Sequence, residues 1–167
     1  MSEPLSLDPI AEAERHWRRH GWPDAATGMA AVTSIMRAHQ IVLARVEAVL
    51  RPHRLTFARY EVLMLLSFSR TGTLPMKLVG SRLQVHPTSV TNAVDRLQDA
   101  GLVRREPHPD DARSLLVALT DSGRDVARAA TTDLNAAVFS QPGLSPAGTA
   151  ELVRVLTDLR RGAGDFT

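Results

Sequence analysis

The chain has 167 residues, of which 44% are hydrophobic and 23% charged, and its formal net charge is +2. This length predicts one domain with helical extensions and a core that needs no cross-links. The absence of cysteine excludes disulfides, zinc–thiolate sites and thiol-based redox sensing. Lys77 is the only lysine, so arginine carries nearly all the positive charge. Arginine suits phosphates and base edges, but an Arg-, Ala- and Pro-rich composition also fits a GC-rich genome.

The apolar runs are too short to cross a bilayer, and the N-terminus "MSEPLSLDPIAEAERHW" does not have the pattern of a secretory leader. We therefore expect a cytoplasmic protein without a membrane partner.

The first third of the chain predicts three helices. "PIAEAERHWRRHGW" reads as a short helix that ends at Gly21. Residues 27–50 carry apolar side chains at steps of three and four, which is the period of one helical face. After the break at Pro52, Phe57–Phe68 is apolar nearly all round and is expected in the core.

The middle of the chain predicts two short helices in tandem. Pro75 suits the first turn of a helix that directs Met76, Val79 and Leu83 inward, and a break follows at Gln84 and Val85. Pro87 then opens a second helix, which Gly101 closes in the left-handed conformation. Two short helices with a tight connection form a helix-turn-helix unit.

A hairpin and two further helices follow. Residues 102–106 and 114–119 read as strands joined by "PHPDDAR" as a long tip. Thr120 caps a helix to about Phe139, and Ser145 with Pro146 starts a last helix that ends at Gly162. The fold class is therefore mainly α with a small β-hairpin wing: a winged helix-turn-helix.

The second helix of this unit has the layout of a helix that reads the DNA major groove. Its inward stripe is apolar, while its outward face carries small polar groups near the N-terminus and a guanidinium two turns later. Short side chains allow close approach, and Asn or Arg can reach base edges. The alternative is an ordinary solvated face. The DNA-binding candidates on this helix are Pro87, Thr88, Ser89, Thr91, Asn92 and Arg96.

The tip of the hairpin carries two adjacent acids and an arginine. A hairpin tip offers no desolvated pocket to raise the pKa of an acid, so catalysis is not predicted there. Asp111 can instead hold the guanidinium of Arg113 by a charge-assisted pair and direct it outward. An arginine on a thin hairpin suits the narrow minor groove.

These residues carry a resemblance to a known family. "DDARSLLVALTDSG" resembles the wing signature of the MarR family, an Asp-x-Arg, an apolar strand and then Leu-Thr-x-x-Gly. "LQVHPTSVTNAVDRLQDAGLVRRE" is similar to the turn, recognition helix and first wing strand of that family. The resemblance follows the order of elements over residues 27–159, and residues 83–123 are its specific part. The signature positions are Asp111, Arg113, Leu119, Thr120 and Gly123.

The resemblance implies a ligand-responsive, homodimeric transcription regulator that binds pseudo-palindromic double-stranded DNA, and a repressor is expected. It places Arg113 in the minor groove, held by Asp111, and makes the outer helices the dimer interface. The implied parts are residues 1–26 as an N-terminal extension, 27–51 and 121–167 as the helical dimerisation region, and 52–120 as the DNA-binding domain. Apolar stripes on the outer helices agree with an interface, although a monomer core would show the same pattern.

An effector is also implied, since members of the family commonly bind phenolic or other small anions. Trp17 resembles a tryptophan that lines the ligand pocket of the urate-responsive subgroup, and the alternative is an aromatic residue that anchors the extension. His39 is either a core histidine or a polar group in an effector cleft. Lack of cysteine argues against the peroxide-sensing branch. The ligand-binding candidates are Trp17, Arg37, His39 and Arg59, with Arg45 as a further cation.

Other functions are alternative interpretations of the same residues. Glu12, His16 and His20 share a helix face, so zinc is geometrically possible, but a site would need further ligands, and no metal or cofactor is predicted. A hydrolase would need a phosphate loop, a nucleophile elbow or a His-Glu-x-x-His helix, and we expect no enzyme. The remaining alternative is a helical dimeric scaffold or small-molecule-binding protein without a DNA role.

Overall fold

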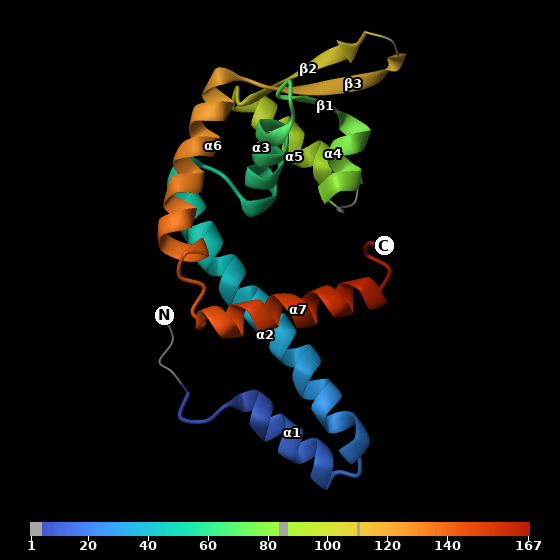
Figure 1. Cartoon of the computed structure of the whole chain (residues 1–167), viewed down its shortest axis with the longest axis vertical. Coiled ribbons are helices and arrows are strands. Elements are labelled where there is room, and N and C mark those ends of the chain that lie inside the picture. Colours follow the sequence, from blue (N-terminus) through green and yellow to red (C-terminus); the bar gives the residue numbers. More distant parts are fainter. Residues whose placement is uncertain (1–4, 84–86, 110) are drawn as a thin grey trace. The chain divides into compact units, whose positions relative to one another are not determined.

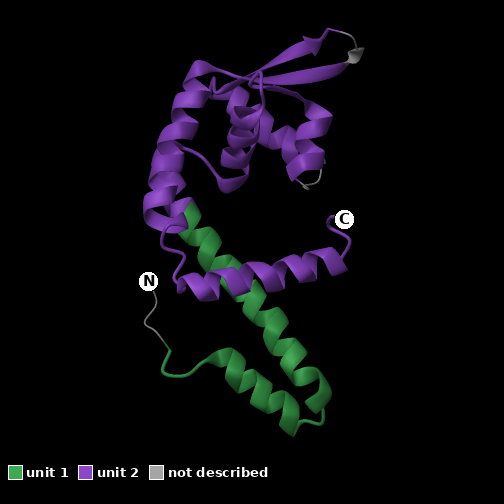
Figure 2. Ribbon diagram, viewed as in Figure 1, with its two compact units in different colours: residues 1–46 green, residues 47–167 purple. Residues whose placement is uncertain are grey.

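The computed structural model describes residues 5–83, 87–109 and 111–167, with backbone only for Pro87 and residues 111–113. The elements in chain order are α1 (Pro9–Arg19), α2 (Pro23–Leu50), a 3-10 turn (Arg51–His53), α3 (Phe57–Phe68), β1 (Thr73–Pro75), α4 (Met76–Leu83), α5 (Pro87–Asp99), β2 (Val103–His108), β3 (Asp111–Leu119), α6 (Asp121–Leu134), a π-helical turn (Asn135–Phe139) and α7 (Pro146–Gly162), as Figure 1 shows. Two compact units divide the chain, residues 1–46 and 47–167 (Figure 2). Within the described ranges, no helix is both long and apolar enough to cross a membrane.

The first unit is a helical hairpin. The Asp8 side chain accepts a hydrogen bond from the backbone N–H of Ile10 and caps α1. Gly21 has a φ of +91°, which lets the chain reverse before α2 begins at Pro23, four residues earlier than the sequence pattern predicts. The carboxylate of Glu14 then accepts hydrogen bonds from Arg18 and from Thr27, so α1 is tied to α2 within this unit.

The core of the second unit forms around α3. Thr56 caps this helix by accepting a hydrogen bond from the backbone N–H of Arg59, so the helix begins at the predicted residue. Its inward side chains pack against α4, α5, α6 and the sheet. The largest fully buried side chains of this unit are Leu50, Val62, Leu63, Leu66, Val79, Val94, Leu97, Val103, Val117 and Leu134.

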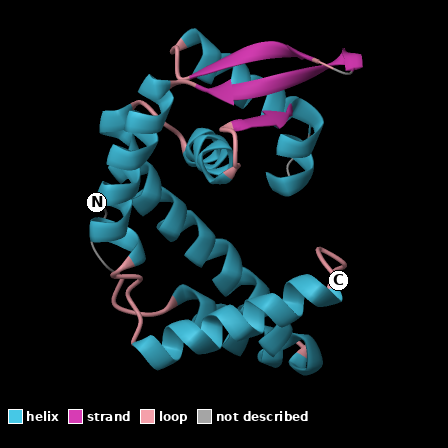
Figure 3. Cartoon of the chain, turned by 45° about the horizontal axis from the view of Figure 1, so that its top comes forward, coloured by secondary structure: helices cyan, strands magenta, loops and turns pink. Residues whose placement is uncertain are grey.

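A three-stranded antiparallel sheet lies beside these helices (Figure 3), in the order β1-β3-β2. The sequence does not predict β1, a strand of three residues that pairs with β3 from Thr73 opposite Ala118 to Pro75 opposite Leu116. Pro75 therefore ends a strand, and the prediction that it lies in the first turn of a helix is wrong. An edge strand accommodates a proline because its missing N–H can face away from the ladder.

The hairpin is longer than predicted. β2 extends to His108 and β3 begins at Asp111, so most of "PHPDDAR" belongs to the strands rather than to a tip loop. Pairing continues outward to His108 opposite Asp111, with an irregularity between Pro107 and His108. Cross-strand hydrogen bonding outweighs the turn preference of Pro107, whereas Pro109 lies in the turn. β1 reaches only Leu116 of β3, so the outer hairpin is a two-stranded ribbon (Figure 1).

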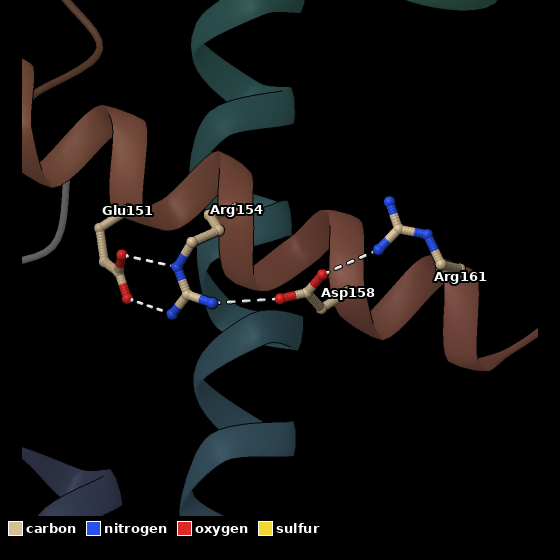
Figure 4. A network of polar contacts seen from close by, with 4 residues as sticks. All are labelled: Glu151, Arg154, Asp158 and Arg161. Carbon is tan, nitrogen blue, oxygen red and sulfur yellow. Dashed lines mark hydrogen bonds and ion pairs between the residues drawn. The ribbon is translucent and has the colours of Figure 1, made fainter.

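The C-terminal helices begin and end as the sequence predicts. Thr120 caps α6 and Ser145 caps α7, each through its side-chain oxygen, and the π-helical turn carries the first of them on to Phe139. The exposed face of α7 holds a ladder of ion pairs (Figure 4), in which Arg154 bridges Glu151 and Asp158, and Asp158 also contacts Arg161. The hydrogen bond from Arg154 lowers the pKa of Glu151 below its usual value. Such exposed pairs are screened by solvent and contribute little to the stability of the helix.

Candidate nucleic-acid interface

Helix α5 separates an apolar inner face from a polar outer face. Val90, Val94 and Leu97 are at most 2% exposed, which anchors the helix on the core as predicted. Ala93, also predicted to point inward, is only half-buried and lines a groove. The outward candidates on the described part of the helix are all exposed: Thr88, Ser89, Thr91, Asn92 and Arg96. The Pro87 side chain lies outside the described residues.

Two contacts fix the C-terminal half of α5. Gly101 adopts a φ of +71°, the left-handed conformation predicted for it, and lets the chain turn directly into β2. From β2, the guanidinium of Arg105 contacts the carboxylate of Asp95 at 2.5 Å and donates to the side-chain oxygen of Gln98 at 3.2 Å. The helix is thereby fastened to the first strand of the wing.

A second junction joins α5 to α6 through Thr120. The Thr120 hydroxyl donates to the Gly101 carbonyl at 2.8 Å and accepts from the backbone N–H of Gly123 at 2.9 Å. The first turn of α6 approaches the backbone so closely that a Cβ on Gly123 would lie 2.0 Å from the Leu102 carbonyl oxygen. This geometry gives a physical reason for the Leu-Thr-x-x-Gly part of the wing signature.

The predicted wing pair lies on β3. The backbone of Asp111 and Arg113 belongs to that strand, and not to the tip loop in which the sequence reading placed them. Their side chains lie outside the described residues, so the contact between them stays a prediction. Asp110 at the tip lies outside as well. Nearer the base, Arg104 contacts Glu106 on the same strand.

An open groove of about 400 Å³ runs between the N-terminus of α3 and the outer face of α5. Ser89, Asn92 and Arg96 line it from α5, and Thr56 and Arg59 line it from α3. The Arg59 Nε donates to the Thr56 hydroxyl at 3.2 Å. The sequence predicts Arg59 only as a ligand candidate, because nothing in the spacing of residues 59 and 96 shows that they share a surface.

The other ligand candidates lie in the first unit. Trp17 packs against the ring of Trp22 at a centroid distance of 5.3 Å, so it anchors the corner between α1 and α2. Arg37 donates to the Gln40 side chain at 3.3 Å, and His39 is exposed, which does not agree with a core histidine. The structure does not bring Arg59 together with these three in one unit.

The metal candidates form only a pairwise contact. His16 Nε2 lies 3.2 Å from the Glu12 carboxylate, while His20 Nδ1 contacts the backbone carbonyl of His16. Among the described residues, no group of three or more His, Cys, Asp or Glu side chains is arranged to hold a metal ion.

The polar groups beside α5 are suited to binding anions and base edges. No charged or polar side chain of the described residues is fully buried. Glu61 on α3 is half-buried, and burial raises the pKa of its carboxyl above the usual value. The groove beside α5 is lined by guanidinium, hydroxyl and amide groups, which donate hydrogen bonds to anions and base edges.

Comparisons with known proteins agree with this architecture. The family model of the MarR family matches residues 54–114. The solved structure of Sco5413, a MarR family transcriptional regulator from Streptomyces coelicolor, is 52% identical, with a TM-score of 0.77 over 84% of this chain and 97% of that one. The chain belongs to the MarR family.

This MarR family chain also matches an uncharacterised helix-turn-helix transcriptional regulator of Mycobacterium leprae, with 36% identity over 66 residues, or 40% of this chain. It thus spans about half the length of the curated relatives it matches, 46% in this case. Sco3205 of Streptomyces coelicolor, solved in complex with DNA, shares the fold at 24% identity, with a TM-score of 0.69 over 97% of this chain and 92% of that one. Family and fold are those of transcriptional regulators, and the predicted winged helix is confirmed.

Proposed function

We propose that this MarR family regulator binds pseudo-palindromic double-stranded DNA as a homodimer, with α5 in the major groove and Arg113 of the wing in the minor groove. The observation that carries the proposal is the outer face of α5. It presents short polar side chains and Arg96. The helix itself is held by its buried inner face, by the turn at Gly101 and by the contact of Arg105 with Asp95. Such a helix can approach base edges without moving its own support.

Exposed apolar side chains on the outer helices support the dimer. In α2 these are Val32, Ile35, Met36, Ile41 and Val42, which are 42–63% exposed. In α7 they are Leu152, Val153, Val155 and Leu159, which are 46–60% exposed. Contiguous apolar patches on a soluble chain mark interaction surfaces. A two-fold dimer would present its two recognition helices roughly 34 Å apart, one turn of DNA.

Binding to the DNA upstream of the chain's own gene tests the proposal. We expect a sequence-specific mobility shift, two-fold symmetric protection and an affinity that falls steeply with salt. Arg96→Ala is expected to lose about 1–3 kcal/mol of discrimination if it contacts a guanine. Arg113→Ala should weaken binding while sedimentation still gives a dimer. A dimer that shifts no duplex would instead favour the helical scaffold without a DNA role.

An effector and a cytoplasmic location complete the proposal. Trp17, Arg37, His39 and Arg59 stay candidates for a small aromatic or anionic effector. A thermal-shift screen of aromatic acids, purines and metals, repeated with DNA, tests this idea. By linkage a true inducer stabilises the free protein and weakens DNA binding reciprocally.

A further inference from the structure

The groove beside α5 continues into a second groove that the DNA-reading face does not use. This second groove, of about 270 Å³, lies where the 3-10 turn leads into α3, and it shares Thr56 and Arg59 with the first. Arg51 and Arg54 line it from the turn, and Glu47 is its acidic residue. We call the guanidinium groups along the two grooves the arginine trench, which consists of Arg51, Arg54, Arg59 and Arg96.

The turn that presents Arg51 and Arg54 is held on both sides. Leu50 before it is fully buried and Leu55 after it is 5% exposed. The backbone N–H of Arg54 donates to the Arg51 carbonyl at 2.9 Å. His53 Nε2 contacts Asp133 of α6 at 2.7 Å, which fastens the turn to that helix. The two arginines therefore extend from a fixed backbone, and little ordering is needed when they bind.

Among the described lining residues, the arginines of the trench outnumber the acidic groups. In the part of the chain that the structure describes, none of the four trench arginines forms an ion pair, whereas Arg104, Arg105, Arg128 and Arg154 all do. The Nε of Arg59 donates a hydrogen bond to the Thr56 hydroxyl. Among the described residues that line the second groove, Glu47 supplies one carboxylate and the arginines supply three guanidinium groups. An arginine fork pairs with two oxygens of one phosphate or carboxylate.

We propose that the arginine trench binds backbone phosphates of DNA and extends the contact surface from α5 to the turn at Arg51 and Arg54. This inference rests on the proposed function, because α5 must lie on a duplex for the trench to reach its backbone. The trench is open, and its lining is mostly hydroxyl, amide and guanidinium groups, which suits a phosphate chain better than an apolar ligand. Contacts to phosphates position a protein on DNA and carry no sequence information.

Each phosphate contact has a measurable signature in salt. Neutralising one phosphate on duplex DNA releases counterions and contributes about 0.9 to the slope of log affinity against log salt. Because the proposed homodimer carries both arginines twice, removing Arg51 and Arg54 removes four contacts and should lower the slope by about 3.6. From the counterion contribution alone, each lost contact weakens binding by roughly 8-fold at about 0.1 M salt, a tenth of the 1 M reference.

The experiment is a salt titration of the full-length protein by fluorescence anisotropy, on the duplex upstream of its gene and on a scrambled duplex. We compare wild type with Arg51→Gln/Arg54→Gln and with Arg128→Gln, which removes an exposed charge of α6 outside the trench. We expect the double variant to show the lower slope on both duplexes with its preference between them unchanged, while the control keeps the wild-type slope. Circular dichroism of each variant verifies the fold.

Three results would overturn the inference in distinguishable ways. A wild-type slope in the double variant removes the trench from the DNA contact but leaves the proposed function intact. An unchanged slope combined with lost inhibition by inorganic phosphate or benzoate would assign the trench to a free anion. If the wild type binds neither duplex, the proposed function fails and the inference fails with it.

Discussion

Adding one methyl group at Gly123 tests whether the junction of α5, the wing and α6 is as tight as the structure shows. A Cβ there would lie 2.0 Å from the Leu102 carbonyl oxygen, whereas ordinary van der Waals contact begins at 3.4 Å. The difference, 3.4 minus 2.0, means that the two backbones must separate by about 1.4 Å, because neither is a flexible side chain. That separation also strains the hydrogen bond from the Thr120 N–H to the same carbonyl.

The expected change in the free energy of unfolding combines two destabilising contributions with one stabilising contribution. Overpacking of this kind costs about 1–3 kcal/mol, and each weakened hydrogen bond costs about 0.5–1.5 kcal/mol. The alanine gains about 0.4–1 kcal/mol by restricting the unfolded chain. We therefore expect Gly123→Ala to lower the free energy of unfolding by roughly 2–3 kcal/mol.

Urea denaturation followed by circular dichroism, at a fixed protein concentration, measures this change. With an m-value of roughly 2–3 kcal/mol/M, the midpoint should fall by about 1 M. Gly28→Ala is the matched control, since nothing lies within 4 Å of its Cβ position in the interior of α2. It should gain about 0.5–1 kcal/mol. A midpoint for Gly123→Ala equal to that of the wild type would refute the reasoning.

Three further changes test other contacts. Thr120→Ala removes the cap of α6 and the hydrogen bond to Gly101, so we expect the free energy of unfolding to fall by about 1–2 kcal/mol in the same urea assay. Thr120→Ser keeps the hydroxyl and should retain most of the wild-type stability. Glu61→Gln should stabilise the protein at neutral pH: burial raises the carboxyl pKa, the folded state therefore holds its proton more tightly, and stability falls as pH rises through the range between the unfolded and folded pKa values. An advantage that persists unchanged at a pH well below 4.5 would contradict this cause. Arg105→Gln breaks the pair with Asp95 and should cost about 1 kcal/mol or less in stability, while the reversed pair Arg105→Asp/Asp95→Arg recovers part of it; equal losses in both variants would argue against the ion pair.

Sequence patterns locate most helices because their ends carry local chemistry. The side chains of Thr56, Thr120 and Ser145 each cap a helix, and the predicted starts of α3, α6 and α7 are confirmed. β1 was missed because a strand of three residues shows no periodicity, and it exists only through its partner on β3. The tip of the hairpin was predicted too long for the same reason, since pairing extends the strands past residues that favour turns.

In the candidate site too, features that depend on one helix can be predicted from the sequence, and features that combine distant segments cannot. The outer face of α5 could be read from the sequence, since it depends on residues of one helix. The groove that adds Arg59, and the trench that adds Arg51 and Arg54, combine α5 with residues that lie thirty or more positions earlier in the sequence. Periodicity cannot show such neighbours, because their proximity is a property of packing around α3.

The Thr120 hydroxyl has a mechanical consequence. One oxygen bridges the end of the recognition helix and the first turn of α6, while the backbone of the same residue continues from the wing. This link adds to the contacts of Arg105 with Asp95 and Gln98, which already fasten α5 to the wing. A rotation of α6 would therefore also move α5 and the wing.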